Sequence, residues 1–496
     1  MRRWLAPLIS MAVFAALLAL VLWVPEGEEE VPQAEEEPDL LIDAEVADVE
    51  RVMIDMGPER LVLVQDPDPS GGDALWRLAE PLEVPVSQSQ VRSLVANLVR
   101  LKPLRVVAEE AENLAEFGLD EPTGRVSIRM RDGTAHTVLI GDEPPVQEGQ
   151  SIRHYATLEG TATVVILPSY LTDGLKWEVG DIRRKEVVAL EDVDSVRGIT
   201  VAQAHEVTDL EPAPERPGEL PVDWQVVAPF HFPASTDKVM ELLRGLRALR
   251  VEEFVEDYPA DLAPYGLEEP GFKVTLRVET AGGVREKTLL GGNLADSEAQ
   301  TMYVMTGDEP FVYKIKTGSL AALPLDGFSL ARLRPFRDAT SQMAMEIAWE
   351  IPGSEGRLRR TNREAVFTQS EWNLVSGGRE TDFSGDEDLQ DLLEKIRSLE
   401  GQNLLDLSEH VDPGEYGFEA GPDQPYARVQ ITVSDRPVGT RLDDPLEEYS
   451  ATLLVGAPLE GTRSRYLLLE GYGAALVVED PLVEAILEGL QALPER

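Results

Sequence analysis

The sequence predicts an α+β fold in which an N-terminal transmembrane helix precedes three tandem modules, each a mostly antiparallel sheet with helices on one face. Three observations predict it: a long apolar segment near the N-terminus, a tryptophan motif that recurs at a fixed interval, and an amphipathic helix pattern after each tryptophan. The predicted organisation is a transmembrane anchor at residues 1–25 and an acidic linker at 26–42, followed by modules at 43–191, 192–339 and, more divergent, 340–496.

The N-terminal segment has the features of an uncleaved membrane anchor. Arg2 and Arg3 precede an apolar stretch from Trp4 to Val24, whose 21 residues would form a helix about 31 Å long, enough to cross the hydrocarbon core. Acidic residues follow the stretch, so the positive-inside rule keeps the N-terminus cytoplasmic and exports the rest. A cleaved signal peptide is the main alternative, although its apolar region would be shorter and residues 22–26 offer no small-x-small cleavage site.

An internal repeat defines the modules. Trp76, Trp224 and Trp372 are evenly spaced, since 224−76 and 372−224 both equal 148. Helices with an i, i+3, i+4, i+7 apolar stripe are expected at 87–101, 235–249 and about 384–399. The stripes are Val91, Leu94, Val95, Leu98 and Leu101; Val239, Leu242, Leu243, Leu246 and Leu249; and Leu389, Leu392, Leu393, Ile396 and Leu399.

The segments after each helix predict the second half of each module. An aromatic residue beside glycine predicts a tight turn at Phe117-Gly118, Tyr265-Gly266 and Tyr416-Gly417. Alternating strands are expected at 126–130, 273–277 and 428–432. A strand ending on Gly141, Gly291 or Gly456 then precedes a strand containing Tyr155, Tyr303 or Tyr466, and each module closes with one more strand and a short helix.

This succession of tryptophan, helix, aromatic-Gly-Leu turn, glycine-ended strand and tyrosine strand resembles the DUF4340 domain, a bacterial family of unknown function. The resemblance covers about residues 45–340. It is weaker over 341–496, where Trp372 is not followed by the proline and Phe418 replaces leucine. Members are typically N-terminally anchored, and some are encoded beside gliding-type ABC transporter components. The resemblance therefore implies an accessory role in envelope transport, and it brings no catalytic residues.

Composition excludes several classes of function. The net charge is −46, from 91 acidic and 45 basic residues spread over the whole chain. Such a surface repels phosphates, so we expect no nucleic-acid partner. There is no cysteine, hence no disulfide, thiolate nucleophile or cysteine-based metal site.

Candidate chemical motifs are few, and each is better explained by structure. The segment Asp66–Asp73 suggests a calcium loop, but position 12 is Arg77, and a hairpin turn is favoured. The glycine pairs Gly282-Gly283 and Gly291-Gly292 indicate turns, and the recurring tryptophans indicate core positions rather than a ligand groove. The acidic pairs Asp120-Glu121 and Glu268-Glu269 indicate solvated turns rather than an acid/base dyad. The five histidines, at positions that show no metal-ligand spacing, are His136, His154, His205, His231 and His410.

We therefore predict no catalytic, cofactor or metal residues and leave the binding residues open. The expected function is a non-enzymatic scaffold or binding protein, anchored in the cell membrane with its bulk in the periplasm. The membrane and a protein of an ABC-type envelope transporter are the expected partners, and no small-molecule ligand is identified. Two alternatives stay open, an envelope hydrolase and a small-ligand sensor, each with its site at a module interface.

Overall fold

The computed structural model of the chain describes residues 39–66, 74–145, 152–203, 206–216, 218–219, 222–337, 343–361, 371–383, 387–407, 413–418, 427–435 and 447–493. The predicted anchor at 1–25 and most of the predicted linker lie outside these residues. Among the described helices, none is long and apolar enough to span a bilayer. The chain divides into two compact units, one ending at Arg184 and the other beginning at Lys185.

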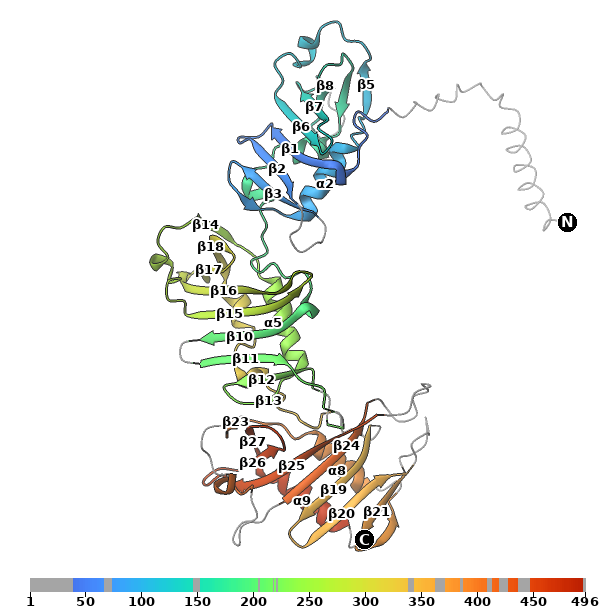
Figure 1. The fold of residues 1–496 in the computed structure, drawn as a ribbon, viewed down its shortest axis with the longest axis vertical. Coiled ribbons are helices and arrows are strands. Elements are labelled where there is room, and N and C mark those ends of the chain that lie inside the picture. The colour runs from blue at the N-terminus through green and yellow to red at the C-terminus, as the bar shows by residue number, and fades with distance from the viewer. Residues whose placement is uncertain are drawn as a thin grey trace, which may run out of the picture. The chain divides into compact units, whose positions relative to one another are not determined.

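Three nine-stranded antiparallel sheets confirm the predicted α+β class and the threefold repeat (Figure 1). The order of the strands is the same in the three sheets. It is given below for each sheet, from one edge to the other. The first is β4 (Val84–Pro85), β3 (Leu75–Glu80), β2 (Leu61–Asp66), β1 (Val49–Asp55), β6 (Gly124–Met130), β7 (Ala135–Ile140), β8 (His154–Leu158), β9 (Val164–Leu167) and β5 (Arg105–Ala108). The second is β13 (Phe232–Pro233), β12 (Trp224–Ala228), β11 (Glu206–Pro212), β10 (Val196–Gln203), β15 (Phe272–Thr280), β16 (Gly283–Asp296), β17 (Thr301–Thr306), β18 (Glu309–Lys316) and β14 (Glu253–Asp257). The third is β22 (Arg379–Asp382), β21 (Trp372–Ser376), β20 (Ser354–Arg360), β19 (Ala344–Ile351), β24 (Ala427–Ser434), β25 (Glu448–Pro458), β26 (Ser464–Leu469), β27 (Ala474–Glu479) and β23 (Asn403–Asp406).

The first strand of each sheet pairs with its two neighbours in the same register in all three copies. A register shift lies at Val49/Arg51, Val196/Gly198 and Ala344/Glu346. Positions can therefore be matched between copies from the strand pairing alone. Equivalent residues of modules one and two are 147 apart on the first strand, as for Val49 and Val196, and 148 apart on its neighbour, as for Arg129 and Arg277.

One helix of each module packs on the sheet through the predicted apolar stripe. These helices are α2 (Gln88–Val99), α5 (Thr236–Ala248) and α8 (Glu387–Arg397), and Figure 1 shows α5 beside the second sheet. Every residue of the three predicted stripes is buried. Burying one such aliphatic side chain contributes about 1.5–3 kcal/mol, so each stripe holds its helix on the sheet. At the helix N-termini, the side chain of Ser235 accepts a hydrogen bond from the Lys238 amide, whereas Ser87 makes no side-chain cap bond.

The helix connects the two opposite edges of its sheet, which the sequence did not predict. The chain leaves the short edge strand β4, crosses as α2 and returns as β5 on the far edge beside β9. The second and third modules repeat this path through α5 and α8. Each module closes with the remaining helices: α3 (Ser169–Gly174) and α4 (Val179–Ile182), α6 (Thr317–Ala321) and α7 (Gly327–Leu330), and α9 (Asp480–Ala492).

The segments that leave modules one and two are also repeated, in a register different from the one the sequence suggested. The amide of Ser87 donates to Ile182 O, and that of Ser235 donates to Leu330 O, at 2.8 Å each. Ile182 therefore corresponds to Leu330, so residues 181–185 match 329–333, although in sequence Asp181–Lys185 resembles the basic segment 333–338. The resemblance in basic residues misled the alignment because arginine occurs at several nearby positions.

Candidate functional site

The residues shared by the three copies build the fold. Trp76, Trp224 and Trp372 are 1%, 8% and 0% exposed, which confirms them as core residues. The turn aromatics pack edge-to-face on the predicted tyrosine strands, with ring centroids 5.0–5.1 Å apart in Phe117–Tyr155, Tyr265–Tyr303 and Tyr416–Tyr466. The turn glycines Gly118, Gly266 and Gly417 have φ of 65°, 66° and 74°, the left-handed region that favours glycine.

The glycine that ends the next strand serves a close backbone approach. A Cβ on Gly141 would lie 2.1 Å from Phe117 O, and one on Gly292 would lie 2.1 Å from Tyr265 O. The module-two counterpart of Gly141 is therefore Gly292, not Gly291 as the sequence pattern suggested. Gly291 instead corresponds to Ile140, and its open space is filled by the ring of Phe272 opposite.

Most of the candidate residues from the sequence do not converge. The possible calcium loop lies, after Asp66, outside the described residues, as do His205 and His410. His154 is buried beside Gly141 O at 3.1 Å, and His136 lies on β7. Among the described residues no group of three or more His, Asp or Glu side chains is placed to hold a metal ion.

His231 is the exception, because it lies where the second and third sheets meet within the C-terminal unit. Its ring packs on Tyr472 with centroids 5.2 Å apart, and Phe232 lies 5.9 Å from the same tyrosine. The guanidinium of Arg216 lies 5.7 Å from the Tyr472 ring centroid. Tyr472, in the turn between β26 and β27, thus inserts among side chains of the second module.

Backbone hydrogen bonds also connect the second and third modules at this place. The amide of Gly473 donates to His231 O at 2.9 Å, and the amide of Ser450 donates to Gly218 O at 2.7 Å. Glu219 makes an isolated parallel bridge with Ser450, so the β11–β12 connection lies alongside the start of β25. We call this set of contacts the joint, defined by Arg216, Gly218–Glu219, His231, Ser450 and Tyr472–Gly473.

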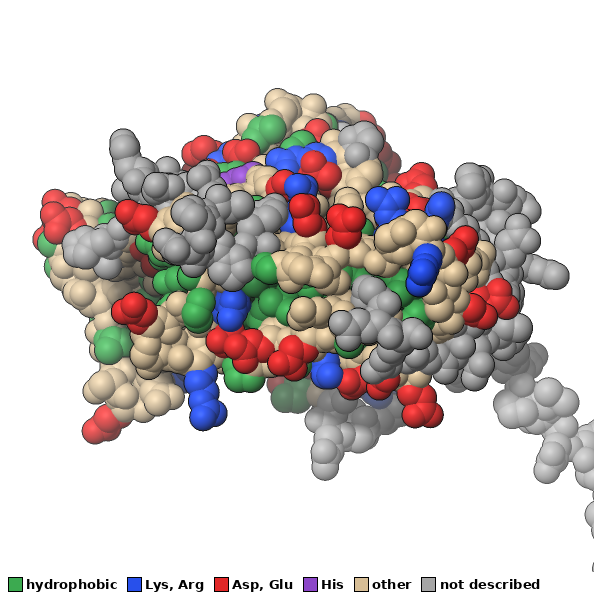
Figure 2. All heavy atoms as spheres, turned by 90° about the horizontal axis from the view of Figure 1, so that it is seen from below, with side chains coloured by type: hydrophobic (Ala, Val, Ile, Leu, Met, Phe, Trp, Pro, Cys, Tyr) green, Lys and Arg blue, Asp and Glu red, His purple; other side chains and the backbone are tan. Residues whose placement is uncertain are grey.

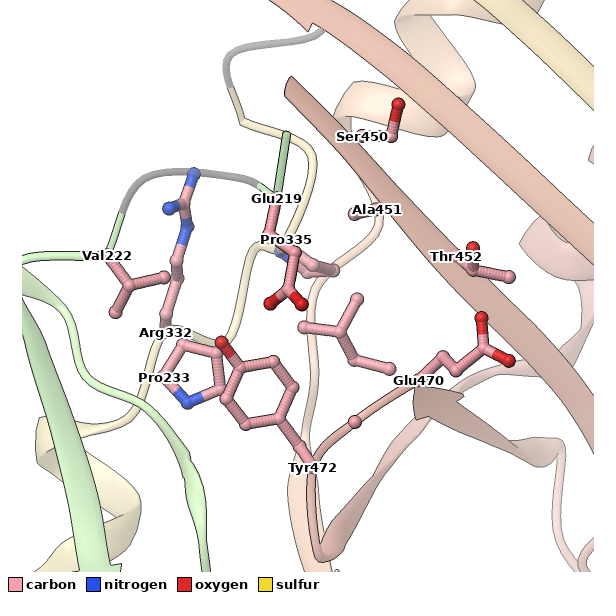
Figure 3. A pocket seen from close by; sticks show the side chains of 12 residues that line it. Glu219, Val222, Pro233, Arg332, Pro335, Ser450, Ala451, Thr452, Glu470 and Tyr472 are labelled. Atoms are coloured by element: carbon pink, nitrogen blue, oxygen red, sulfur yellow. The ribbon is translucent and has the colours of Figure 1, made fainter. Parts of the chain in front are cut away.

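A cavity of about 280 Å³ lies beside the joint (Figure 3). Its walls are contributed by both modules. In Figure 3 the Tyr472 ring lies next to Pro233, and the carboxylate of Glu219 points toward the cavity. The full lining is Glu219, Val222, Pro233, Arg332, Pro335, Ser450, Ala451, Thr452, Leu469, Glu470, Gly471 and Tyr472.

The electrostatics of the cavity are mixed. Glu219 pairs with Arg216 at 3.2 Å, and Glu470 pairs with Arg428 at 2.6 Å. Burial lowers the pKa of His231, with a further contribution from Arg216, and burial raises the pKa of Tyr472. Acidic and basic side chains are also intermingled on the face of the molecule shown in Figure 2.

Sequence reasoning missed the joint, except for naming His231 among the histidines. Tyr472 sits at a turn that has no aromatic counterpart in the other two copies, where the corresponding residues are Gly160-Thr161 and Gly307-Asp308. A residue peculiar to one copy, flanked by Gly471 and Gly473, is the signal that could have found it. The cavity can admit a small ligand with apolar and polar groups, because its lining includes both apolar and polar side chains, as in ligand pockets at domain interfaces.

The fold defines a class of protein built from tandem α+β modules, each a nine-stranded antiparallel sheet with a helix that connects its two edges. Two stretches of the chain, residues 76–220 and 224–370, match the family described as a domain of unknown function, DUF4340. The chain belongs to this family. No curated protein and no solved structure matches the chain.

The two family matches begin inside a sheet rather than at its first strand. The match at 76–220 starts at Trp76 on β3 and runs on through β10 and β11 of the second sheet. The match at 224–370 likewise starts on β12 and includes β19 and β20 of the third. The repeating unit of the family is thus offset from the sheet by two strands.

Proposed function

We propose that this chain is a membrane-anchored scaffold or binding protein of the cell envelope, not an enzyme. The observation that carries the proposal is the role of the repeated residues. The positions common to the copies are buried tryptophans, edge-to-face aromatic pairs and left-handed glycines, all of which stabilise a module. Repetition of structural residues, without a repeated cluster of polar side chains, favours a role in binding over a role in catalysis.

The placement outside the cytoplasm rests on the N-terminal sequence. Arg2-Arg3, the apolar segment 4–24 and the acids that follow favour a single-pass anchor with its N-terminus in the cytoplasm. A reporter enzyme that is active only outside the cytoplasm, fused after residue 496, tests this orientation. Activity of the fusion, with resistance of the chain to carbonate extraction, is expected. An inactive fusion contradicts it.

The proposed partner is a component of an ABC-type envelope transporter, as family membership implies. In-cell crosslinking followed by purification of the full chain should recover a permease or ATPase subunit. The matched control is the same chain with 1–25 replaced by a cleavable signal peptide, which should lose that partner if recruitment depends on the membrane. Failure to recover any transporter or membrane component would remove the support for this partner.

The cavity at the joint favours a second candidate function, small-ligand sensing. It is close to the lower end of the 300–1,000 Å³ typical of ligand pockets, and it lies at an interface between modules. A thermal-shift screen of the full chain in detergent tests it. A stabilising compound should lose its effect in Thr452→Val or Glu470→Gln, which alter the wall and leave the Tyr472 contacts in place.

A further inference from the structure

Large hydrophobic side chains are exposed mainly on the N-terminal unit. Of the eleven such exposed residues among those the structure describes, six belong to this unit. They are Leu40 (41% exposed), Leu104 (46%), Val106 (42%), Val107 (37%), Ile152 (46%) and Tyr170 (63%). We call these six residues the apolar corner. Exposed apolar side chains that gather on one part of a fold mark an interaction site.

Hydrogen bonds place these residues at one end of the sheet edge formed by β5. The amide of Leu41 donates to Leu101 O at 2.8 Å, which brings Leu40 to the start of the β5 segment. The amide of Leu104 donates to Ile166 O at 2.9 Å near the end of β9. β8 pairs with β9 through His154 and Leu167, so Ile152 and Tyr170 extend from that same end. Val106 and Val107 lie on β5 itself, the edge strand of the sheet, and both are exposed.

The second module provides an internal comparison, because its fold places residues of another kind at four of the six positions, whereas Val106 and Val107 correspond to Phe254 and Val255. The Val187 amide bonds Leu249 O and the Glu252 amide bonds Lys314 O, so Leu40 corresponds to Glu186 and Leu104 to Glu252. The pairing of Met302 with Ile315 matches Ile152 to Gln300. Tyr170, the second residue of its helix, corresponds to Gly318. The shared fold therefore does not require apolar residues at these four positions, and of these two modules only the first exposes them.

The charges near the apolar corner differ from those of the whole chain. Arg100, Lys102 and Arg105 lie along the start of the edge, and Arg100 pairs with Glu45 at 3.1 Å. Asp39 and Asp43 lie on the incoming segment, so this end is close to neutral in a chain of net charge −46. The acids Glu109, Glu110 and Glu112 lie at the other end of the edge, beside Ala162. The corner is thus the part of this edge that a bilayer surface repels least.

The apolar corner also includes residues close in sequence to the predicted membrane anchor. The described chain begins at Asp39, and 14 residues (25–38) separate it from the predicted membrane segment, a reach of at most about 50 Å. A surface held this close to a bilayer meets it at a high effective concentration, so weak apolar contacts suffice for docking. Aliphatic side chains interleaved with Arg and Lys, with a tyrosine beside them, are the composition of interfacial membrane contacts.

We propose that the apolar corner docks on the lipid bilayer, inserting Leu40, Leu104, Ile152 and Tyr170 into the interfacial region. The proposal rests on the proposed membrane anchor and adds that the first module lies against the membrane rather than hanging freely from the linker. The partner is the bilayer itself. A protein partner that covers the corner is the competing outcome of the test.

The experiment uses the full chain reconstituted in phospholipid nanodiscs. Because the chain has no cysteine, Val106→Cys carries a single environment-sensitive fluorophore at the corner, and Leu294→Cys, on the second module and 66% exposed, carries the control. Lipids with a spin label near the headgroup should quench the fluorophore at 106 and leave the one at 294 unchanged. The triple substitution Leu40→Glu, Leu104→Glu and Ile152→Gln should abolish the quenching. These substitutions copy the second module and therefore suit the fold.

The outcomes separate this proposal from the proposed function. A chain that stays in the nanodisc without quenching at position 106 overturns the docking and leaves the anchor intact. Equal quenching at 106 and 294, or quenching that survives the triple substitution, also overturns it. A chain that does not insert at all contradicts the anchor and the docking together. Protection of position 106 that appears only when membrane proteins are added assigns the corner to a protein partner and overturns the bilayer proposal.

Discussion

Replacing Tyr472 by alanine tests the joint between the second and third modules. The substitution removes ring contacts with His231 and Phe232, each worth about 0.5–1.5 kcal/mol beyond the area buried. It also removes the cation–π contact with Arg216, worth about 0.5–1 kcal/mol. These contacts share one ring and do not add fully, so we expect opening of the joint to become about 2 kcal/mol easier.

Amide hydrogen exchange reads this opening directly. The Gly473 amide bonds His231 O and the Ser450 amide bonds Gly218 O, so both exchange only when the joint separates. A change of about 2 kcal/mol corresponds to about 30-fold faster exchange at these two amides. Amides inside β19 and β24 serve as the internal reference, because their protection depends on the third sheet itself.

The matched control is Tyr472→Phe, which keeps the ring and removes only the hydroxyl. Exchange in this variant should stay within about threefold of the parent chain, since the contacts used in the estimate are made by the ring. If Tyr472→Ala also stays within about threefold, the ring does not hold the joint and the reasoning fails. Uniformly faster exchange throughout the third sheet would mean that Tyr472 stabilises its own module instead.

Three further predictions follow from the packing. Gly291→Ile should destabilise the second sheet by more than about 3 kcal/mol in urea unfolding, because a Cβ at this position would lie 1.7 Å from the Phe272 ring. Adding Phe272→Gly recreates the Gly124/Ile140 pair of the first module and should recover most of the lost stability. Gly118→Ala should cost about 1–3 kcal/mol, since φ is +65° and the new Cβ meets Asp142, whereas Gly180→Ala, which meets nothing within 4 Å, should lower the urea midpoint much less. The pKa of His231 is lowered, so its neutral form favours the closed joint. The contribution of His231 to the stability of the closed joint is complete above a pH of about 6.5 and declines as the pH falls below that value. Exchange of the Gly473 amide should therefore become faster at low pH, and this change should be missing in the control His231→Gln.

Repetition explains why so much of the fold could be predicted. A stripe such as Val91, Leu94, Val95 and Leu98 identifies one helix, and finding it again 148 residues later identifies a module. The crossing to the far edge was missed because β5 is four residues long and almost fully exposed, so it shows no alternating pattern. The choice between Gly291 and Gly292 failed for a related reason: both complete the motif, and only the opposing Phe272 distinguishes them.

The candidate site was harder to predict than the fold because nothing repeats there. Tyr472 meets His231 across more than two hundred residues of sequence, and no local period connects them. The exposed residues of the first module posed the opposite difficulty. Leu104 and Ile152 look like ordinary strand residues until the paired strands show that Glu252 and Gln300 occupy the same places in the next copy.

The offset between the family repeat and the sheet bears on how such chains change length. Residues 76–223 number 148, one full period, and begin at the third strand of a sheet. Removing them joins β2 to β12, which yields a hybrid sheet with its first two strands from the first module and its other seven from the second. Every strand keeps a counterpart of its normal neighbour, because the pairing registers match. Unequal recombination between any two equivalent positions would therefore add or remove a whole module without leaving an unpaired sheet.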